Sequence, residues 1–384
     1  MRIESRMFPS IFQAWTPAQN VNETTVDGQA GSITAASTIE SATTTLARHD
    51  LVWQGPTSFH LQWNNLTNIG LSTGFTNSSI DRALKLRSEL SAINPQIVLL
   101  SEIRYHDGPD DYIPEASSWW IRDAQGKRIS AKKTVAGSWY LLDYNNPTLQ
   151  DQVALQCQAV VQTGALDGCM FDWWSQDDLG RVALIKKVRA KIGDRAIIVV
   201  NVNQSQLSGS APYVNGIYME GMLPKSMGGV YDWQTAAQNL LWANGHLRTP
   251  SFTALDAWAE NPAAVPASLG RNHVSLMRFA TTLSLTHSDG YVLFADANGL
   301  PTLDHLHDWY PFWNKGLGHP TSQPGQSQTD GTFVREFTNG RVICNPPGNS
   351  LAKIHFDNAV TSLATGTRAT DFFISSGDGD IYLH

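Results

Sequence analysis

The chain has 384 residues, of which 42% are hydrophobic and 16% are charged, and its net charge is −7. This length and composition indicate a globular protein with ample material for a core, longer than the usual single domain of about 100–200 residues. The acidic balance and the lack of a sizeable Lys/Arg cluster argue against a nucleic-acid partner. No run of about 18 apolar residues occurs, so we expect no membrane partner or membrane span.

Two further features bear on the compartment. The three cysteines, Cys157, Cys169 and Cys344, form neither a disulfide framework nor a zinc-binding spacing. Residues 1–6 lack the apolar stretch of a signal peptide. Localisation therefore stays open between a cytoplasmic protein and a secreted or periplasmic one whose leader has been removed.

Eight short apolar runs have the length of buried strands, and helical patterns lie between most of them. The predicted strands cover residues 7–15, 50–55, 96–102, 167–172, 196–201, 216–220, 251–258 and 290–296. The predicted helices cover residues 33–46, 77–94, 147–163, 179–192, 233–245 and 272–287. Strands alternating with helices in this way are typical of the α/β class and predict a (β/α)8 TIM barrel.

Residues 107–138 form a long excursion after the third strand, with several prolines and glycines. The segment Asp123 to Arg128 within it has the composition of a hairpin turn. Because long insertions after barrel strands surround the active-site end, we expect this one to form a wall of the cleft.

The C-terminal part of the chain alternates apolar and polar residues as strands do. Residues 332–344 predict a hairpin around Asn339-Gly340, and residues 372–374 and 381–383 predict a second pair. We therefore expect a catalytic barrel over residues 1–315 and a small C-terminal β segment over residues 316–384, packed on the barrel.

The fourth predicted strand ends in the feature around which the chain is organised. It runs through Cys169, Met170 and Phe171 to Asp172, and Trp173 and Trp174 follow. An acid at the C-terminal end of a parallel barrel strand stands where TIM-barrel enzymes place catalytic groups. Indole rings offer flat apolar faces to the C–H groups of sugars. The structural alternative is an Asp that caps the next helix beside two half-buried core rings.

The other predicted strand ends add more carboxylates to the same rim. They carry Glu102, Asn201, Glu220, Asp256 and Asp296. Several acids among tryptophans, with few basic groups, suit glycoside hydrolysis. That reaction needs one carboxylic acid to protonate the leaving oxygen and a second carboxylate to attack the sugar or to activate water.

Asp172 and Glu220 are the expected catalytic pair. Their strands are separated by one strand, so the strand axes lie about 9–10 Å apart. Side chains that reach inward then bring the carboxyl groups to about 5–6 Å, the separation of a retaining enzyme. We assign Asp172 as nucleophile and Glu220 as general acid/base. Tyr218, Met219 and Met222 are expected to provide the apolar surroundings that suit a general acid.

A larger set of residues is expected to bind the substrate. It comprises Trp15, Glu102, Tyr105, Trp173, Trp174, Asn201, Asp256, Trp258 and Asp296. Three of these acids have structural alternatives: Glu102 as a partner of Arg104, and Asp256 and Asp296 as helix caps.

The cluster Asp304, His305, His307 and Asp308 has the composition of a metal site. No matching ligand set accompanies it, so neither a metal nor any cofactor is predicted. The expected partner is a carbohydrate substrate, and the oligomeric state is unknown.

Three stretches carry a resemblance to known proteins. Leu142-Asp143-Tyr144-Asn145-Asn146-Pro147, followed by residues 164–174, resembles the TIM-barrel glycoside hydrolases of the glycosyl hydrolase-like family 15 type, which are related to the endo-α-1,4-polygalactosaminidases. Residues 334–346 are similar to the terminal β segment of that group. The likeness covers most of the chain and is weakest over residues 1–50 and 107–138. It implies a catalytic Asp on the fourth strand and a second acid later, and it suggests an α-linkage without naming the sugar.

Two other functions compete with this interpretation. A non-catalytic carbohydrate-binding barrel would bind glycans without turning them over. A metal-dependent hydrolase or deacetylase would require histidines at the strand ends, and the predicted ends carry none.

Overall fold

The computed structural model describes residues 3–15, 41–134, 137–223, 231–258, 274–295, 305, 307, 309–314 and 316–384. Two predicted features fall partly or wholly beyond this set. Asp296 and most of the predicted helix 33–46 lie outside the described residues. None of the described helices combines the length and the apolar character needed to cross a membrane.

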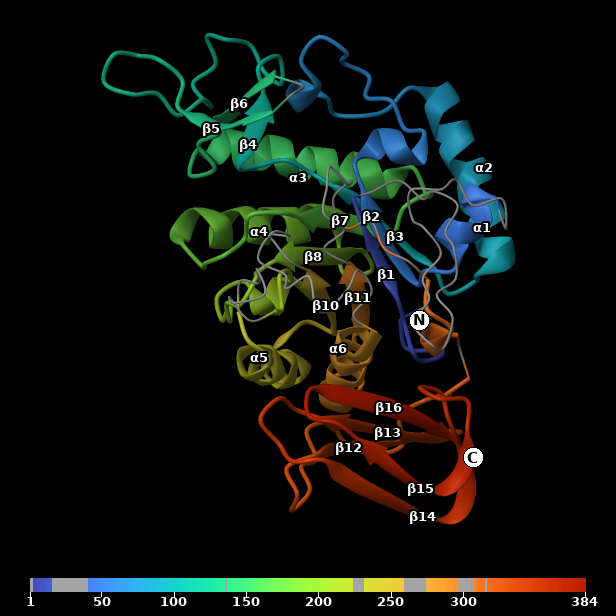
Figure 1. The fold of residues 1–384 in the computed structure, drawn as a ribbon. Coiled ribbons are helices and arrows are strands. Elements are labelled where there is room, and N and C mark those ends of the chain that lie inside the picture. Colours follow the sequence, from blue (N-terminus) through green and yellow to red (C-terminus); the bar gives the residue numbers. More distant parts are fainter. Residues whose placement is uncertain are drawn as a thin grey trace.

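The centre of the molecule is an eight-stranded parallel sheet that closes into a barrel (Figure 1). In spatial order its strands are β1 (Phe12–Ala14), β2 (Leu51–Gln54), β3 (Val98–Glu102), β7 (Gly168–Phe171), β8 (Ile197–Asn201), β9 (Gly216–Met219), β10 (Phe252–Trp258) and β11 (Tyr291–Ala295). A parallel bridge between Ile11 and Val292 joins the first strand to the last. The predicted TIM barrel is therefore confirmed.

The strands are buried because both of their faces are covered, as expected for parallel sheets. Every residue of β7, β8, β9 and β11 is buried. Continuous apolar runs such as Ile197–Asn201 fit this environment. The predicted strands match the observed ones to within two residues at each end, except that β1 begins five residues later than predicted.

Six helices accompany the barrel: α1 (Ala42–Ala47), α2 (Asn77–Ile93), α3 (Pro147–Gln162), α4 (Leu179–Ile192), α5 (Trp233–His246) and α6 (Val274–His287) in the described part of the chain. Short 3-10 turns lie at Pro56–Phe59, Ile69–Leu71, Ala211–Tyr213 and Pro311–Trp313. Side-chain caps begin several of the helices. Asn146 accepts the backbone N–H of Thr148 at the start of α3, directly before Pro147, as the sequence predicts.

The excursion after β3 folds into a small antiparallel sheet. Its order is β4 (Asp107–Pro109), β6 (Gly137–Leu141) and β5 (Ser130–Thr134). The predicted turn is present: Arg122 and Arg128 form an antiparallel bridge, and Gly126 adopts a φ of 79° between them. Figure 1 shows this sheet beside α3, at the opposite end of the molecule from the C-terminal strands.

The C-terminal segment is a five-stranded antiparallel sheet. Its order is β12 (Phe333–Phe337), β13 (Gly340–Asn345), β16 (Asp378–Leu383), β14 (Ala352–Ser362) and β15 (Arg368–Ile374). The predicted hairpin at Asn339-Gly340 is confirmed, since Phe337 pairs with Gly340. The predicted pairing of residues 372–374 with 381–383 is wrong. Strand β14, which the sequence analysis missed, lies between them and pairs with both.

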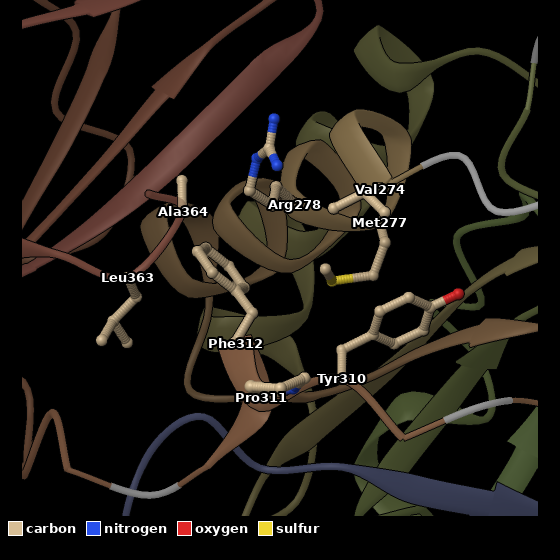
Figure 2. A pocket seen from close by; sticks show the side chains of 8 residues that line it. All are labelled: Val274, Met277, Arg278, Tyr310, Pro311, Phe312, Leu363 and Ala364. Carbon is tan, nitrogen blue, oxygen red and sulfur yellow. The ribbon is translucent and has the colours of Figure 1, made fainter. Parts of the chain in front are cut away.

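Helix α6 joins this sheet to the barrel. The guanidinium of Arg278 donates to both carboxylate oxygens of Asp378, at 2.9 and 2.6 Å. At Gly379 the strand lies so close to Thr282 of α6 that a Cβ atom would be only 2.0 Å from the Thr282 hydroxyl. Figure 2 shows a small pocket at this junction, between Phe312, Arg278 and the turn at Leu363. The exact boundary at residues 315 and 316 stays a prediction.

Candidate active site

Asn201 connects the two acids that the sequence singled out. Its side-chain nitrogen donates to Oδ1 of Asp172 and to Oε2 of Glu220, at 2.8 Å each. Because both oxygens lie 2.8 Å from one atom, they are at most twice that distance, about 5.6 Å, apart. The Asn201 Oδ1 accepts the backbone N–H of Asn203 at 3.2 Å, so the amide nitrogen faces the carboxylates.

The register of three adjacent strands creates this arrangement. Phe171 of β7 pairs with Val200 of β8, so the next residues, Asp172 and Asn201, leave the barrel side by side. Glu220 follows the last residue of β9, on the other side of β8. The three polar groups therefore meet at the C-terminal rim, where TIM barrels hold their sites.

Asp172 lies in an environment that disfavours its charge. Burial raises the pKa of Asp172 to about 7, and the neighbouring charges of Glu102 and Glu220 contribute to the rise. Hydrogen bonds from Asn201 and from the backbone N–H of Trp173, at 2.8 Å each, oppose it. Near neutral pH both the protonated and the ionised form of this carboxyl group are therefore populated.

Glu102 lies at the end of β3 and has two partners. The indole N–H of Trp15 donates to its Oε2 at 2.9 Å. Arg104 lies 3.7 Å from its Oε1 and 3.4 Å from Asp107, and the guanidinium covers the face of Trp139 at 4.1 Å from the ring centroid. The predicted Arg104 contact is therefore present, and Glu102 still reaches the pocket beside Asp172.

Trp173 is the exposed ring of the site, with half of its surface open to solvent. Its backbone is in the left-handed region, with a φ of 57°. Two donors hold its carbonyl oxygen there: the Tyr105 hydroxyl at 2.9 Å and Arg181 at 2.8 Å. His106 stacks on one face of the indole at 5.5 Å. A non-Gly residue held in this way is typical of a functional site.

Trp174 and Tyr105 do not present the surfaces that the sequence analysis expected. Trp174 is fully buried, and its indole N–H donates to Ser210 at 3.1 Å. Tyr105 is buried as well, and its hydroxyl is used by the Trp173 carbonyl. The left-handed turn at Trp173 directs the two indoles differently, one toward solvent and one into the core. Trp174 and Tyr105 therefore support the loop from the core.

Asp256 is also buried and contacts other side chains of the site. His305 Nδ1 lies 2.7 Å from its Oδ2, and the Tyr218 hydroxyl donates to the same oxygen at 3.1 Å. On its other side, His305 Nε2 lies 3.2 Å from Glu220 Oε1. With no exposed surface, Asp256 is removed from the direct substrate contact that we expected.

The ionisation of His305 follows from these two acids. Burial acts to lower the pKa of His305, but the contacts with Asp256 and Glu220 outweigh it and raise the value to about 10. Burial raises the pKa of Asp256, and the contact with His305 opposes that rise. The two acids therefore favour the protonated form of the imidazole.

His305 is the site residue whose role the sequence analysis missed. It was considered there only as a member of a metal-like cluster. The described residues contain no group of three or more side chains that could hold a metal ion. Its position after the last strand, outside any regular element, left no signal linking it to Glu220. Asp296 and the side chain of Trp258 lie outside the described residues, so their predicted roles stay predictions.

Comparisons with known proteins place the fold. No protein-family model and no curated protein matches the chain, so the family resemblance has no support from either. Among solved structures, it is similar to a maltogenic α-amylase from Thermotoga neapolitana, with a TM-score of 0.57 and 11% identity over 100% of this chain and 99% of that one. An α-amylase from Lactobacillus plantarum gives 0.56 and 12% over 100% and 99%.

A third similar structure is a debranching enzyme from Nostoc punctiforme, solved from a crystal soaked with acarbose. It has a TM-score of 0.52 and 11% identity over 98% of each chain. At such low identity these likenesses show a shared fold. They do not transfer residue roles, so the chemistry has to be argued from the site itself.

Proposed function

We propose that this protein is a glycoside hydrolase that cleaves O-glycosidic bonds of an oligo- or polysaccharide with retention of configuration. The observation that carries the proposal is the pair Asp172 and Glu220, bridged by Asn201 with their nearest oxygens at most about 5.6 Å apart. Retaining glycosidases hold their two carboxyl groups about 5–5.5 Å apart, whereas inverting enzymes need about 6.5–9.5 Å to admit a water molecule.

In the first step Asp172 is the nucleophile. Its carboxylate oxygen forms a bond to the anomeric carbon while the bond from that carbon to the leaving oxygen breaks. Glu220 gives its proton to that leaving oxygen, so the leaving group departs as a neutral alcohol. Trp173, beside Asp172 and half exposed, is placed to carry the sugar ring.

In the second step water completes the reaction. Glu220, now a carboxylate, takes a proton from a water molecule, whose oxygen bonds to the anomeric carbon as the bond to Asp172 breaks. Asn201 keeps both acids in place throughout, because its two amide hydrogens are committed to them. It thus acts as a positioning residue between the acids, with no amide hydrogen left for the sugar.

An α-linkage is the configuration that we propose for the substrate. Structures similar in fold are named α-amylases, and the sequence resembles relatives of the endo-α-1,4-polygalactosaminidases. These two likenesses are independent of the carboxylate geometry and agree with each other. Neither names the sugar, so the test must sample several.

The test is a screen of the purified protein against a panel of α- and β-linked oligosaccharides, beside Asp172→Asn and Glu220→Gln. We expect turnover by the wild type, a loss of about 10⁵-fold in Asp172→Asn and of about 10²–10⁴-fold in Glu220→Gln. Asp151→Asn and Glu89→Gln are matched controls on the outer helices, since both acids are exposed and pair with a lysine.

Two results would overturn the proposal. If both site variants retain wild-type turnover, the assigned pair is not catalytic. If the wild type binds a glycan of the panel but never cleaves it, the protein is a non-catalytic carbohydrate-binding barrel. Adding azide to an Asp172→Gly variant tests the role of Asp172: a nucleophile's variant yields a glycosyl azide of inverted anomeric configuration, and the variant of a retaining enzyme's acid/base yields one of retained configuration.

A further inference from the structure

We propose that His305 is a positioning residue for the general acid, holding Glu220 through a buried carboxylate–imidazolium–carboxylate chain that begins at Asp256. This inference rests on the proposed function, because it concerns how Glu220 loses and regains its proton. It assigns a task to a side chain that neither the strand pattern nor the comparisons single out.

The chain is a continuous set of contacts. Asp256 Oδ2 lies 2.7 Å from His305 Nδ1, and His305 Nε2 lies 3.2 Å from Glu220 Oε1. The other Glu220 oxygen accepts the Asn201 amide at 2.8 Å. Each oxygen of Glu220 therefore faces a nitrogen, and the carboxyl group is fixed from both sides.

The charges explain why the chain needs all three members. A fully buried carboxylate such as Asp256 is costly without a compensating charge. His305 supplies that charge, and its side chain has no exposed surface. Loss of the Nδ1 proton would leave a lone pair facing the Asp256 carboxylate, and Glu220 Oε1 lies 3.2 Å from Nε2 on the other side of the ring. These two acids thus favour the imidazolium.

The backbone of His305 is held in a strained conformation that serves this placement. Its φ is 57°, in the left-handed region. His307 Nδ1 donates to the His305 carbonyl at 3.0 Å. The other ring nitrogen of His307, Nε2, is hydrogen-bonded to His49 Nε2 at 2.8 Å. Trp15 packs against the imidazole with 5.1 Å between ring centroids. Such strain persists only where the surroundings enforce it.

Other ionisable groups share this part of the rim. Those that interact with Glu220 or His305 come from the end of β7, from β9, from β10 and from the segments after β9 and β11: Asp172, Tyr218, Asp256, Tyr231 and His307. All but His307 are acids or hydroxyls, and burial lowers the pKa of His307 to about 4. Within the described residues, His305 is thus the cation in contact with Glu220.

The chemical consequence concerns the leaving group. When Glu220 protonates the leaving oxygen it becomes a carboxylate, and the imidazolium at 3.2 Å stabilises the charge that develops. This help matters for sugar alcohols, which leave only when protonated. It matters little for 2,4-dinitrophenolate, which leaves without a proton.

The experiment compares His305→Gln with Glu220→Gln on two substrates of the same sugar, an oligosaccharide and a 2,4-dinitrophenyl glycoside. We expect His305→Gln to reduce kcat/KM, which reports the glycosylation step, by about 10²-fold on the oligosaccharide and by less than about threefold on the dinitrophenyl substrate. His287→Gln, a buried histidine of α6 outside the site, serves as the control and should leave the ratio of the two rates unchanged.

The outcomes separate the two proposals. If Glu220→Gln shows the leaving-group dependence and His305→Gln loses equally on both substrates, this inference is overturned and the proposed function stands. If Glu220→Gln itself shows no dependence, Glu220 is not the acid and both fall.

A measurement without substrate keeps the inference testable if His305→Gln is unstable. In protein labelled with ¹⁵N-histidine, the ring whose signals shift in both Glu220→Gln and Asp256→Asn is assigned to His305. It should be doubly protonated at pH 8 in the wild type, and in Asp256→Asn it should titrate at lower pH. A neutral His305 ring at pH 8 would overturn the inference.

Discussion

Asp172 and Glu220 share one hydrogen-bond donor, but their surroundings differ on the far sides. Glu220 has a buried imidazolium against one of its oxygens. Asp172 makes no ion pair with any residue in the described ranges, and its pKa is raised by burial and by two neighbouring acids. The site therefore compensates charge on one side only. A carboxylate left without a cation suits a nucleophile, because the oxocarbenium-like transition state brings the missing positive charge.

The contrast predicts that the ionised Asp172 lowers the free energy of unfolding of the protein. In the unfolded chain an Asp titrates near pH 4, but burial raises the folded pKa of Asp172 to about 7. Between these values the folded state binds more protons, so its free energy of unfolding falls as pH rises from about 4 to 7 and is flat above. We expect Asp172→Asn to exceed the wild type by up to about 4 kcal/mol at pH 8.

Urea unfolding of both proteins at pH 4 and pH 8 measures this effect. At pH 4 the two should have nearly equal stability, because the wild-type carboxyl group is then protonated. Asp151→Asn, which changes an exposed acid on α3, should show no such pH dependence. A variant that is no more stable than the wild type at pH 8 would remove the proposed contrast.

The same pKa predicts the sign of one limb of the pH–rate profile. A nucleophile must be ionised, so ionisation of Asp172 should make kcat/KM rise about tenfold per pH unit below pH 7. The measurement is kcat/KM from pH 4 to pH 9 on the best substrate of the panel. A limb of the opposite sign, falling as pH increases through 7, would give Asp172 the role of the acid and exchange the two assignments.

Sequence reasoning reached Asp172 and Glu220 because strand ends are readable. Apolar runs such as Ile197–Asn201 mark buried strands, and alternation with helices makes their ends converge, so the two acids were expected on one rim. His305 was not reachable in this way. It follows the barrel outside any regular element, and its contacts depend on a left-handed backbone that no local pattern signals.

The adjacent tryptophans show the same limit on a smaller scale. Both were expected to face the substrate, because the pair follows Asp172 directly. The sequence alone does not tell in which direction each side chain of a loop points. The left-handed conformation of Trp173 decides the matter, leaving its ring half exposed and burying Trp174 completely. Side-chain direction in a loop thus comes from tertiary contacts, here the donors Tyr105 and Arg181 on the Trp173 carbonyl.

Trp173, which lies on the Asp172 side of the site, gives the smallest predicted effect. If its open face carries a sugar ring beside Asp172, Trp173→Ala should raise KM about fivefold, equivalent to about 1 kcal/mol, and leave kcat within about twofold. Trp173→Phe keeps a flat apolar face and should retain most of the affinity. Steady-state kinetics on the oligosaccharide measure both. If Trp173→Ala lowers kcat and leaves KM unchanged, the ring acts by orienting Asp172, and the sugar platform must be sought elsewhere on the rim.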